Sequence, residues 1–388
     1  MHHAKSMEDL RARARRLADD ELAPHAATWD EQEVFPERSY QAMHQAGFLG
    51  LTVAEQYGGQ GRGVAEACVV LEELARGCMA SALTLQMNVN GPPRVIARFG
   101  SDEQRERLLP GAADGSRYFA IAMTEPQAGS DGLALAATLT PDGDGYRLDG
   151  DKCHITGGAR ADTFLVFCRA PGTTGPLGVG AVVVESSTPG FEPPTVEPKM
   201  GGRGVAEAVL RFNGVRVSVE DVVIAPDPAS KRGAGILLKQ FNPERCGNAA
   251  MSVGVAQAAF DYAAAYAKER QQFGRRLVDF QGMQWKFADM AVALEASRLL
   301  VQQAASSDDD GFPATRETMM AKLHANEMAQ RVTNEAIQIL GHKGYLRRHP
   351  VERFFRDARG LALGGGTTEI LRNVIAGEVL GERFSQRA

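Results

Sequence analysis

The chain has 388 residues, 44% of them hydrophobic and 23% charged, which allows two or three compact domains. Its 43 basic and 48 acidic residues leave a formal net charge of −5, and no basic block stands out. Nucleic acid and anionic membranes are therefore not expected as partners. The five cysteines lack the spacing of a metal site or a disulfide framework, so no metal is expected and a cytoplasmic location fits best. No apolar run approaches the ~18 residues that a membrane span needs.

The first part of the chain has the spacing of helices. One apolar stripe recurs at intervals of three and four residues, as on one helix face: Val64, Cys68, Leu71 and Ala75. Ser101 followed by Gln104 predicts a capping box at the start of a short helix, and Pro110-Gly111 predicts the end of that helix. We therefore expect an N-terminal helical domain over residues 1–118.

From residue 119 to residue 228 the pattern changes to short runs that are typical of β-strands and are separated by Gly, Pro, Asp and Asn. The runs cover residues 119–123, 145–148, 163–168, 179–184 and 208–212. Asn213-Gly214 is a strong signal for a tight turn. This part of the chain is predicted to form a central, barrel-like β domain over residues 119–228.

The remainder, residues 229–388, is helical in pattern again. Three apolar stripes have helical spacing: Met251, Val255, Ala258 and Tyr262; Met283, Phe287, Met290, Ala291 and Leu294; and Val332, Ala336, Ile339 and Leu340. Long amphipathic helices with short connections predict a C-terminal four-helix bundle, and residues 306–311 are expected to form an exposed loop. The predicted fold is thus a multidomain α+β protein with a helical, a β and a second helical domain.

Residues 124–131 read Thr-Glu-Pro-Gln-Ala-Gly-Ser-Asp, a polar turn whose small residues let backbone N–H groups approach an anionic ligand. By chemistry alone this stretch is more typical of a surface turn. However, it resembles the Thr-Glu-Pro-x-Ala-Gly-Ser-Asp motif of the acyl-CoA dehydrogenase family. Residues 150–158, which follow at the expected distance, are similar to the second flavin-contacting strand of that family.

The resemblance continues over almost the whole chain. Further elements follow in the family's order: Glu269-Arg270-Gln271-Gln272-Phe273-Gly274, Gln281, residues 338–341 with Gly344-Tyr345, residues 350–353 and 356–358, and residues 366–370. Each element alone would be weak evidence. Their order, together with the α–β–α pattern derived independently, identifies the chain as a member of the family.

The resemblance implies FAD, bound without the Gly-x-Gly-x-x-Gly turn that this sequence lacks between a strand and a helix. The cofactor contacts that it implies are Ile121, Met123, Thr124, Gly129, Ser130, His154, Ile155, Thr156, Arg270, Phe273, Gln281, Gln338, Gly341, Thr367 and Glu369. Met123 and Thr124 would contact the pyrimidine end of the flavin, and Thr156 would lie near flavin N5. Gly129 and Ser130 would approach the pyrophosphate and the thioester arm.

Arg270, Gln281 and residues 338–341 would reach the adenine half of an FAD that a neighbouring subunit mainly binds. The resemblance therefore implies a homo-oligomer, commonly a tetramer, with an acyl-CoA substrate and electron-transfer flavoprotein as electron acceptor. The alternative for Arg270 is an ordinary ion pair on a helix surface. His154 replaces the tryptophan that usually lies beside the flavin, so it could flank the flavin or be a plain buried histidine.

Oxidation of an acyl thioester between Cα and Cβ needs a base for the α-proton while hydride leaves Cβ. Most members of the family carry this glutamate just before the Gly-Thr of a late loop, where this chain has Gly365. A minority, including isovaleryl-CoA dehydrogenase, carry it before an arginine on the first long helix of the C-terminal domain. Here that position reads Glu244-Arg245, which makes Glu244 the expected base.

Asn242 has the character of an N-cap and Pro243 that of a first helical residue, which would place Glu244 in the first turn. The alternative interpretation is that Glu244 merely complements the helix dipole, which would also lower its pKa. Glycine at position 365 favours catalysis over that alternative. Substrate contacts are expected from Ser130, Asn242, Arg245, Gly365 and Gly366.

The run Gly364-Gly365-Gly366 removes bulk from the expected pocket wall, which predicts a branched, cyclic or otherwise bulky acyl group. The N–H of Gly365 could still donate to the thioester carbonyl. Two alternatives stay open. One is a flavin enzyme of the same fold with other chemistry, such as an oxidase, a monooxygenase or a desulfinase. The other is a non-catalytic scaffold that binds acyl thioesters.

Overall fold

The computed structural model describes residues 2–307, 312–382 and 384, so part of the loop predicted at 306–311 lies outside the described residues. The N-terminal region is helical: α1 (His2–Leu17), the π-helical η1 (Ala18–Leu22), α2 (Ala26–Gln32), α3 (Glu37–Gln45), α4 (Val64–Gly77), α5 (Met79–Val89), α6 (Pro92–Phe99) and α7 (Asp102–Ala113), with the short 3₁₀ turn η2 (Glu55–Tyr57).

The capping box at the start of α7 is confirmed. The Ser101 hydroxyl accepts from Gln104 N at 3.2 Å, and Ser101 N donates to Gln104 Oε1 at 3.0 Å. The predicted end of this helix at Pro110-Gly111 is wrong, because α7 continues to Ala113. The buried residues Gly111 and Ala112 keep its last turn packed against the protein, and this outweighs the local helix-breaking signal.

The central region forms one eight-stranded sheet in the order β6-β7-β3-β2-β4-β5-β8, with β1 paired in parallel to β4. The strands are β1 (Phe119–Ala122), β2 (Thr138–Asp142), β3 (Gly145–Thr156), β4 (Thr163–Arg169), β5 (Val179–Glu185), β6 (Thr195–Glu197), β7 (Glu207–Val217) and β8 (Val222–Ile224), with the 3₁₀ turn η3 (Val219–Asp221) before β8. Each of the five predicted runs overlaps a strand.

The tight turn predicted at Asn213-Gly214 is wrong, since β7 runs straight through it. The register with β3 shifts between Leu148 and Gly150, which marks a β-bulge opposite this dipeptide. Gly214 has φ +63° and donates its N–H to Asp149 Oδ1 at 2.8 Å. The left-handed backbone that Asn-Gly favours is therefore used in a bulge and not in a hairpin.

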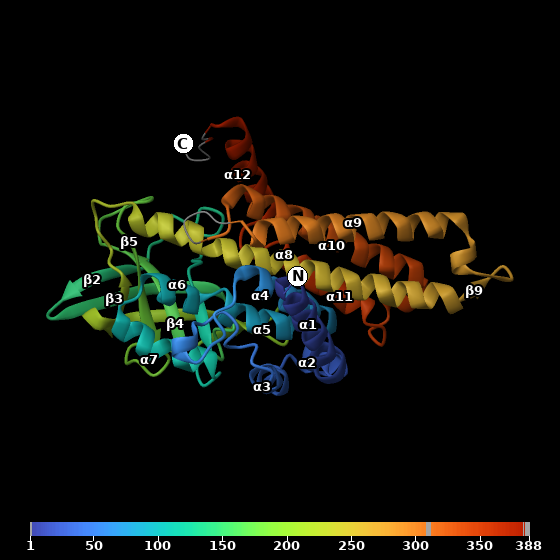
Figure 1. Cartoon of the computed structure of the whole chain (residues 1–388). Coiled ribbons are helices and arrows are strands. Elements are labelled where there is room, and N and C mark those ends of the chain that lie inside the picture. Colours follow the sequence, from blue (N-terminus) through green and yellow to red (C-terminus); the bar gives the residue numbers. More distant parts are fainter. Residues whose placement is uncertain (1, 308–311, 383, 385–388) are drawn as a thin grey trace.

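The C-terminal region is helical again: α8 (Arg232–Glu269), α9 (Gln281–Ala305), α10 (Thr315–Leu340), α11 (Val351–Leu361) and α12 (Thr368–Leu380), with the 3₁₀ turns η4 (Leu277–Asp279) and η5 (Gly341–Tyr345). Between α8 and α9 stands a small hairpin of β9 (Gln271–Gln272) and β10 (Arg275–Arg276). With 38 residues, α8 is about 57 Å long. It runs from beside β5 to the end of the molecule that carries this hairpin (Figure 1).

The prediction of helical, β and helical regions in that order is confirmed, and β4 shows how they are joined. All seven residues of β4 are buried, as expected for a strand covered on both faces. Phe164 and Val166 point into a core shared with the N-terminal helices and the C-terminal bundle. Leu165 and Phe167 point into a second core with α6, α7 and the first turns of α8. In the described ranges, none of the helices has the length and apolarity of a membrane span.

Candidate active site

Glu244 lies in the interior of α8 and not in a first turn. The helix begins at Arg232, eleven residues before Pro243, because Ile236 and Leu237 are buried and draw the chain into the helix earlier. Asn242 therefore caps nothing. Its Nδ2 donates to Pro313 O at 2.9 Å and to the Thr315 hydroxyl at 3.1 Å, which ties α8 to the start of α10.

The environment of Glu244 is nearly dry. The residue is 8% exposed, and its Oε1 has no hydrogen-bond partner among the described residues. Burial raises the pKa of Glu244 to about 8, against the opposing effect of the neighbouring Arg245 guanidinium. The expectation that the helix dipole would lower this pKa is wrong, because Glu244 is far from the helix N-terminus.

Arg245 joins α8 to the late glycine loop. Its Nε donates to Gly365 O at 2.9 Å, and its Nη1 donates to Asn242 Oδ1 at 2.9 Å and to Leu238 O at 3.2 Å. Burial lowers the pKa of Arg245 to about 10, so the guanidinium stays charged at neutral pH. The two places where the family carries its base, occupied here by Glu244 and Gly365, thus lie on segments that touch.

The glycine loop has room for a side chain but an unfavourable backbone for one. Gly365 has φ +72° and Gly366 has φ +103°, which L-residues rarely adopt. A Cβ added at Gly365 would lie 3.5 Å from Lys322 Cε and 3.9 Å from Arg245 Cγ, which are ordinary contacts. The N–H groups of Gly365 and Gly366 form no hydrogen bond with another described residue, so both can donate to a ligand.

Lys322 was missed by the sequence interpretation. It is fully buried on α10, and its Nζ donates to Asn326 Oδ1 at 3.0 Å, Gly366 O at 2.9 Å and, more weakly, Leu361 O at 3.4 Å. Burial, with a smaller effect of the Arg245 charge, lowers the pKa of Lys322 to about 7. Lys322 and Arg245 together hold the glycine loop against the two helices. No local pattern could reveal this, because a lysine on a helix is usually exposed.

A second missed pair fixes the turn at residues 124–131. The Lys152 ammonium, 0% exposed, donates to Glu125 Oε1 at 2.6 Å and to Met123 O at 3.0 Å. The Glu125 carboxylate also accepts from Ala136 N at 2.6 Å and Ala137 N at 3.1 Å. This buried pair joins β3 to the residues that follow β1, so the two motifs assigned to the flavin lie together.

The predicted flavin contacts near this pair form one polar surface. Cys153 N donates to Thr124 O at 2.9 Å, which sets the turn beside the end of β3. The hydroxyls of Thr124, Ser130 and Thr156 form no hydrogen bond with other described residues, and nothing lies within 4 Å of a Cβ built at Gly129. Free hydroxyls and an open glycine suit a polar heterocycle and its phosphates. The residues present therefore fit FAD. Of the apolar members, Ile155 is buried and Ile121 is half-buried.

His154 is not a plain buried histidine, so that alternative is wrong. Its side chain is 62% exposed, and Nδ1 lies 2.9 Å from Glu197 Oε2 on β6. The residue has φ +55° and sits where the register of β3 against β7 shifts. The ring is thus exposed beside Glu197, one residue after Cys153, whose N–H donates to Thr124 O. The flavin-flanking role remains a prediction.

The other predicted cofactor residues lie elsewhere in the fold. Arg270 follows the last residue of α8, and Phe273, 93% exposed with φ +53°, is at the tip of the β9–β10 hairpin. Gln281 begins α9, Gln338 lies in the last turn of α10, and Gly341 follows that helix at the start of η5. Thr367 caps α12, with Glu369 in its first turn. Most of these residues are exposed. Arg270 forms no ion pair with any residue in the described ranges, which argues against its alternative role.

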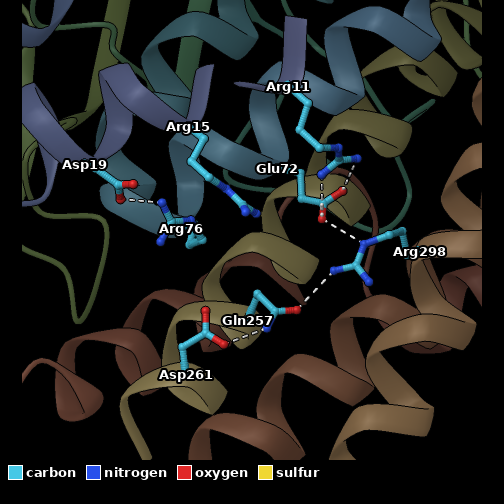
Figure 2. A pocket seen from close by; sticks show the side chains of 8 residues that line it. All are labelled: Arg11, Arg15, Asp19, Glu72, Arg76, Gln257, Asp261 and Arg298. Atoms are coloured by element: carbon cyan, nitrogen blue, oxygen red, sulfur yellow. Dashed lines mark hydrogen bonds and ion pairs between the residues drawn. The ribbon is translucent and has the colours of Figure 1, made fainter. Parts of the chain in front are cut away.

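A polar cavity elsewhere is lined by residues of α1, η1, α4, α8 and α9, and Figure 2 shows its side chains: Arg11, Arg15, Asp19, Glu72, Arg76, Gln257, Asp261 and Arg298. Arg298 Nε donates to Glu72 Oε1 at 2.9 Å, and Arg15 Nε donates to the buried Glu73 at 2.9 Å. Each of the four arginines forms an ion pair, and the carboxylates that take part are Asp19, Glu72, Glu73 and Glu295. This network joins the N-terminal helices to the bundle and contains no predicted site residue.

Comparison with known proteins agrees with this geometry. Family models for the acyl-CoA dehydrogenase N-terminal, middle and C-terminal domains match residues 5–116, 120–215 and 231–380. A 3-sulfinopropanoyl-CoA desulfinase of Paraburkholderia xenovorans (strain LB400) is 39% identical over 383 residues, 98% of each chain. The short-chain specific acyl-CoA dehydrogenase of Clostridium acetobutylicum is 37% identical over 377 residues, 97% of this chain and 98% of the other. A glutaryl-coenzyme A dehydrogenase solved with glutaryl-CoA has a TM-score of 0.93 at 33% identity, with 99% of this chain and 97% of the other covered.

The chain therefore belongs to the acyl-CoA dehydrogenase family, whose members are FAD-dependent oxidoreductases that act on the CH–CH bond of acyl-CoA.

Proposed function

We propose that this enzyme oxidises an acyl-CoA between Cα and Cβ, with Glu244 as the base that removes the α-proton. The observation that carries the proposal is a buried carboxylate with a free Oε1 on the helix that Arg245 ties to the glycine loop. Burial raises the pKa of Glu244 to about 8, close to the pH at which a general base works best. FAD, when bound, supplies the acceptor for the hydride that leaves Cβ.

The residues around Glu244 have distinct tasks in this scheme. Gly365 and Gly366 offer free N–H groups to the thioester carbonyl, where negative charge develops as the α-proton leaves. Arg245 and Lys322 hold these glycines in place through the carbonyls of the same two residues. The positive charge of Arg245 also favours the enolate-like oxygen. Ser130 completes the substrate contacts that we propose. The expected contact from Asn242 is dropped, because its buried amide is already bonded to Pro313 O, Thr315 and Arg245.

The open loop supports an acyl group with bulk near Cα or Cβ, either branched or cyclic. A Cβ built at Gly365 would meet Lys322 Cε at 3.5 Å and Arg245 Cγ at 3.9 Å without a clash, so we propose that a substrate group takes the place of the usual glutamate side chain. The exposed Phe273 and the outlying set of predicted FAD contacts support a homo-oligomer, with a tetramer as the proposed state. Electron-transfer flavoprotein as acceptor and a cytoplasmic location complete the proposal.

The second candidate is desulfination, because one of the similar relatives is named a 3-sulfinopropanoyl-CoA desulfinase. That chemistry would break the C–S bond of the sulfinate with water as co-reactant, so that the carbon gains a proton, sulfite is released and the flavin stays oxidised. Dehydrogenation instead leaves the flavin reduced. The absorbance spectrum of the flavin after mixing with substrate therefore distinguishes the two candidate reactions.

The test is anaerobic bleaching of the flavin absorbance when the holoenzyme is mixed with acyl-CoAs. We expect rapid bleaching by the wild type and a loss of about 10³-fold or more in Glu244→Gln, in line with general-base contributions. Asp261→Asn, which changes an exposed carboxylate on the same helix, is the matched control. If Glu244→Gln bleaches as fast as the wild type, the base assignment is wrong. If sulfinopropanoyl-CoA releases sulfite without bleaching, desulfination replaces dehydrogenation.

A further inference from the structure

A row of polar side chains leads from the turn that carries Glu244 into the interior beneath α5 and α6. Gln86 Nε2 donates to Glu244 O at 2.8 Å, and Asn90 Nδ2 donates to Gln86 Oε1 at 3.0 Å. Arg94 Nε donates to Val89 O at 2.8 Å and to Asn90 Oδ1 at 3.3 Å. Gln86 and Asn90 are almost completely buried. The side-chain bonds thus connect Arg94 through Asn90 and Gln86 to the backbone carbonyl of Glu244.

The row has hydrogen-bond donors to spare. A primary amide carries two N–H groups, and Gln86 and Asn90 each use one in these bonds. The buried Nη2 of Arg94 has no partner among the described residues. One turn before Glu244, the side chain of Gln240 is 1% exposed, and neither of its amide atoms has a partner in the described ranges. Such unused buried groups are costly unless a ligand or water binds them.

Arg94 gives the row a positive charge without a counterion. Its guanidinium forms no ion pair with any described residue, and burial lowers its pKa to about 10, so it remains charged at neutral pH. The carboxylate that influences it, Glu66, accepts a hydrogen bond from Gly63 N at 3.1 Å and so caps α4. A partly buried cation whose buried Nη2 has no partner and whose bonded acceptors are neutral is unfavourable until an anion joins it.

We propose that Gln86, Asn90 and Arg94 bind an anionic group, such as a carboxylate, at the far end of the substrate's acyl chain. The inference rests on the proposed function, since it places the acyl chain along the row that starts at Glu244. A hydrocarbon chain could use none of these donors and would leave the Arg94 charge buried and unmatched. A carboxylate has lone pairs enough for several N–H groups and carries the missing charge.

The test measures equilibrium binding to the FAD-loaded Glu244→Gln enzyme, in which turnover is blocked and the Gln86 bond to the backbone of residue 244 is kept. Calorimetric titrations compare succinyl-, glutaryl- and adipyl-CoA with butyryl-, valeryl- and hexanoyl-CoA. We expect at least one diacid thioester to bind about 10- to 100-fold more tightly than its neutral partner, the range for charge-assisted hydrogen bonds. Adding Arg94→Met should abolish this preference. Adding Arg98→Met, an exposed arginine on the same helix, should leave it unchanged.

Arg94→Lys and Asn90→Leu keep the test decisive if Arg94→Met does not fold. The lysine should retain part of the preference, and the leucine should reduce it. Equal or weaker binding of all three diacid thioesters by the parent enzyme would show that water satisfies the row and would overturn the inference. Bleaching of the wild-type flavin by neutral acyl-CoAs in that case leaves the proposed function standing. A binding preference for diacids without any flavin reduction overturns the proposed function alone.

Discussion

Two glutamates of this enzyme are both buried but differ in their hydrogen-bond partners. Glu125, in the turn after β1, is held by the Lys152 ammonium at 2.6 Å and by two backbone N–H groups. Glu244, on α8, is just as dry, yet its Oε1 has no partner in the described part of the chain. The first carboxylate is held by partners on both oxygens and organises structure. The second is left able to gain and lose a proton.

The difference lies in the partners and not in the depth of burial. Hydrogen bonds and an opposite charge favour the ionised form of a carboxyl group, whereas burial alone favours the neutral form. Glu244 has an arginine as its neighbour in sequence, but that guanidinium is turned to the carbonyls of Gly365 and Leu238. Fixing one carboxylate with partners and leaving an oxygen of another without them thus need different surroundings.

The largest effect that the comparison predicts is on stability. In Lys152→Met, Glu125 loses its ammonium partner, so we expect the free energy of unfolding to fall by about 3–5 kcal/mol. Urea unfolding followed by circular dichroism measures this. Lys199→Met removes a longer, partly exposed ion pair with Glu207 in the same β region and should cost under about 1 kcal/mol. Equal losses in the two variants would contradict the distinction drawn between Glu125 and Glu244.

A smaller effect is expected in the pH dependence. Because Glu244 acts only when ionised and its pKa is about 8, kcat/KM should rise about tenfold per pH unit up to pH 8 and then level off. Its folded pKa lies above the unfolded value, so the folded state binds more protons and stability falls as pH rises from about 4.5 to about 8. Glu244→Gln should remove that part of the stability slope. A rate profile that levels off near pH 5 would show that Glu244 is not the titrating base.

The smallest effect is expected at Lys322. In Lys322→Met the side chain keeps its volume but no longer donates to Gly366 O, so the glycine loop should shift relative to Glu244. We expect flavin reduction to slow about tenfold, with little change in melting temperature, because the cost of a buried charge disappears with the lost hydrogen bonds. Stopped-flow absorbance measures the rate. Lys286→Met, on the surface of α9, is the control. An unchanged rate of flavin reduction would show that the position of the glycine loop does not affect the reaction.

Local sequence patterns predicted much of the fold. The helix stripes, the capping box at Ser101 and the β runs are confirmed, because each depends on residues a few positions apart. Three local signals misled. The helix that was expected to end at Pro110-Gly111 continues to Ala113, Asn-Gly at residue 213 forms a bulge, and Asn242-Pro243 lies within a helix that buried Ile236 and Leu237 start earlier. In each case tertiary packing outweighed the local preference, which is about 3 kcal/mol for a proline inside a helix. The domain limits at 118 and 228 stay predictions.

The sequence alone determined the family and its cofactor. It also led to the proposal of Glu244 as the base, since glycine at 365 and Glu-Arg at 244 can be read without coordinates. Only the tertiary structure decided how that glutamate is poised. Its dry surroundings, the clamp of Arg245 and Lys322 on the glycine loop, and the donor row that ends at Arg94 join residues up to 158 positions apart. Burial and partnership of charges are properties of packing, and packing is settled only when distant helices meet.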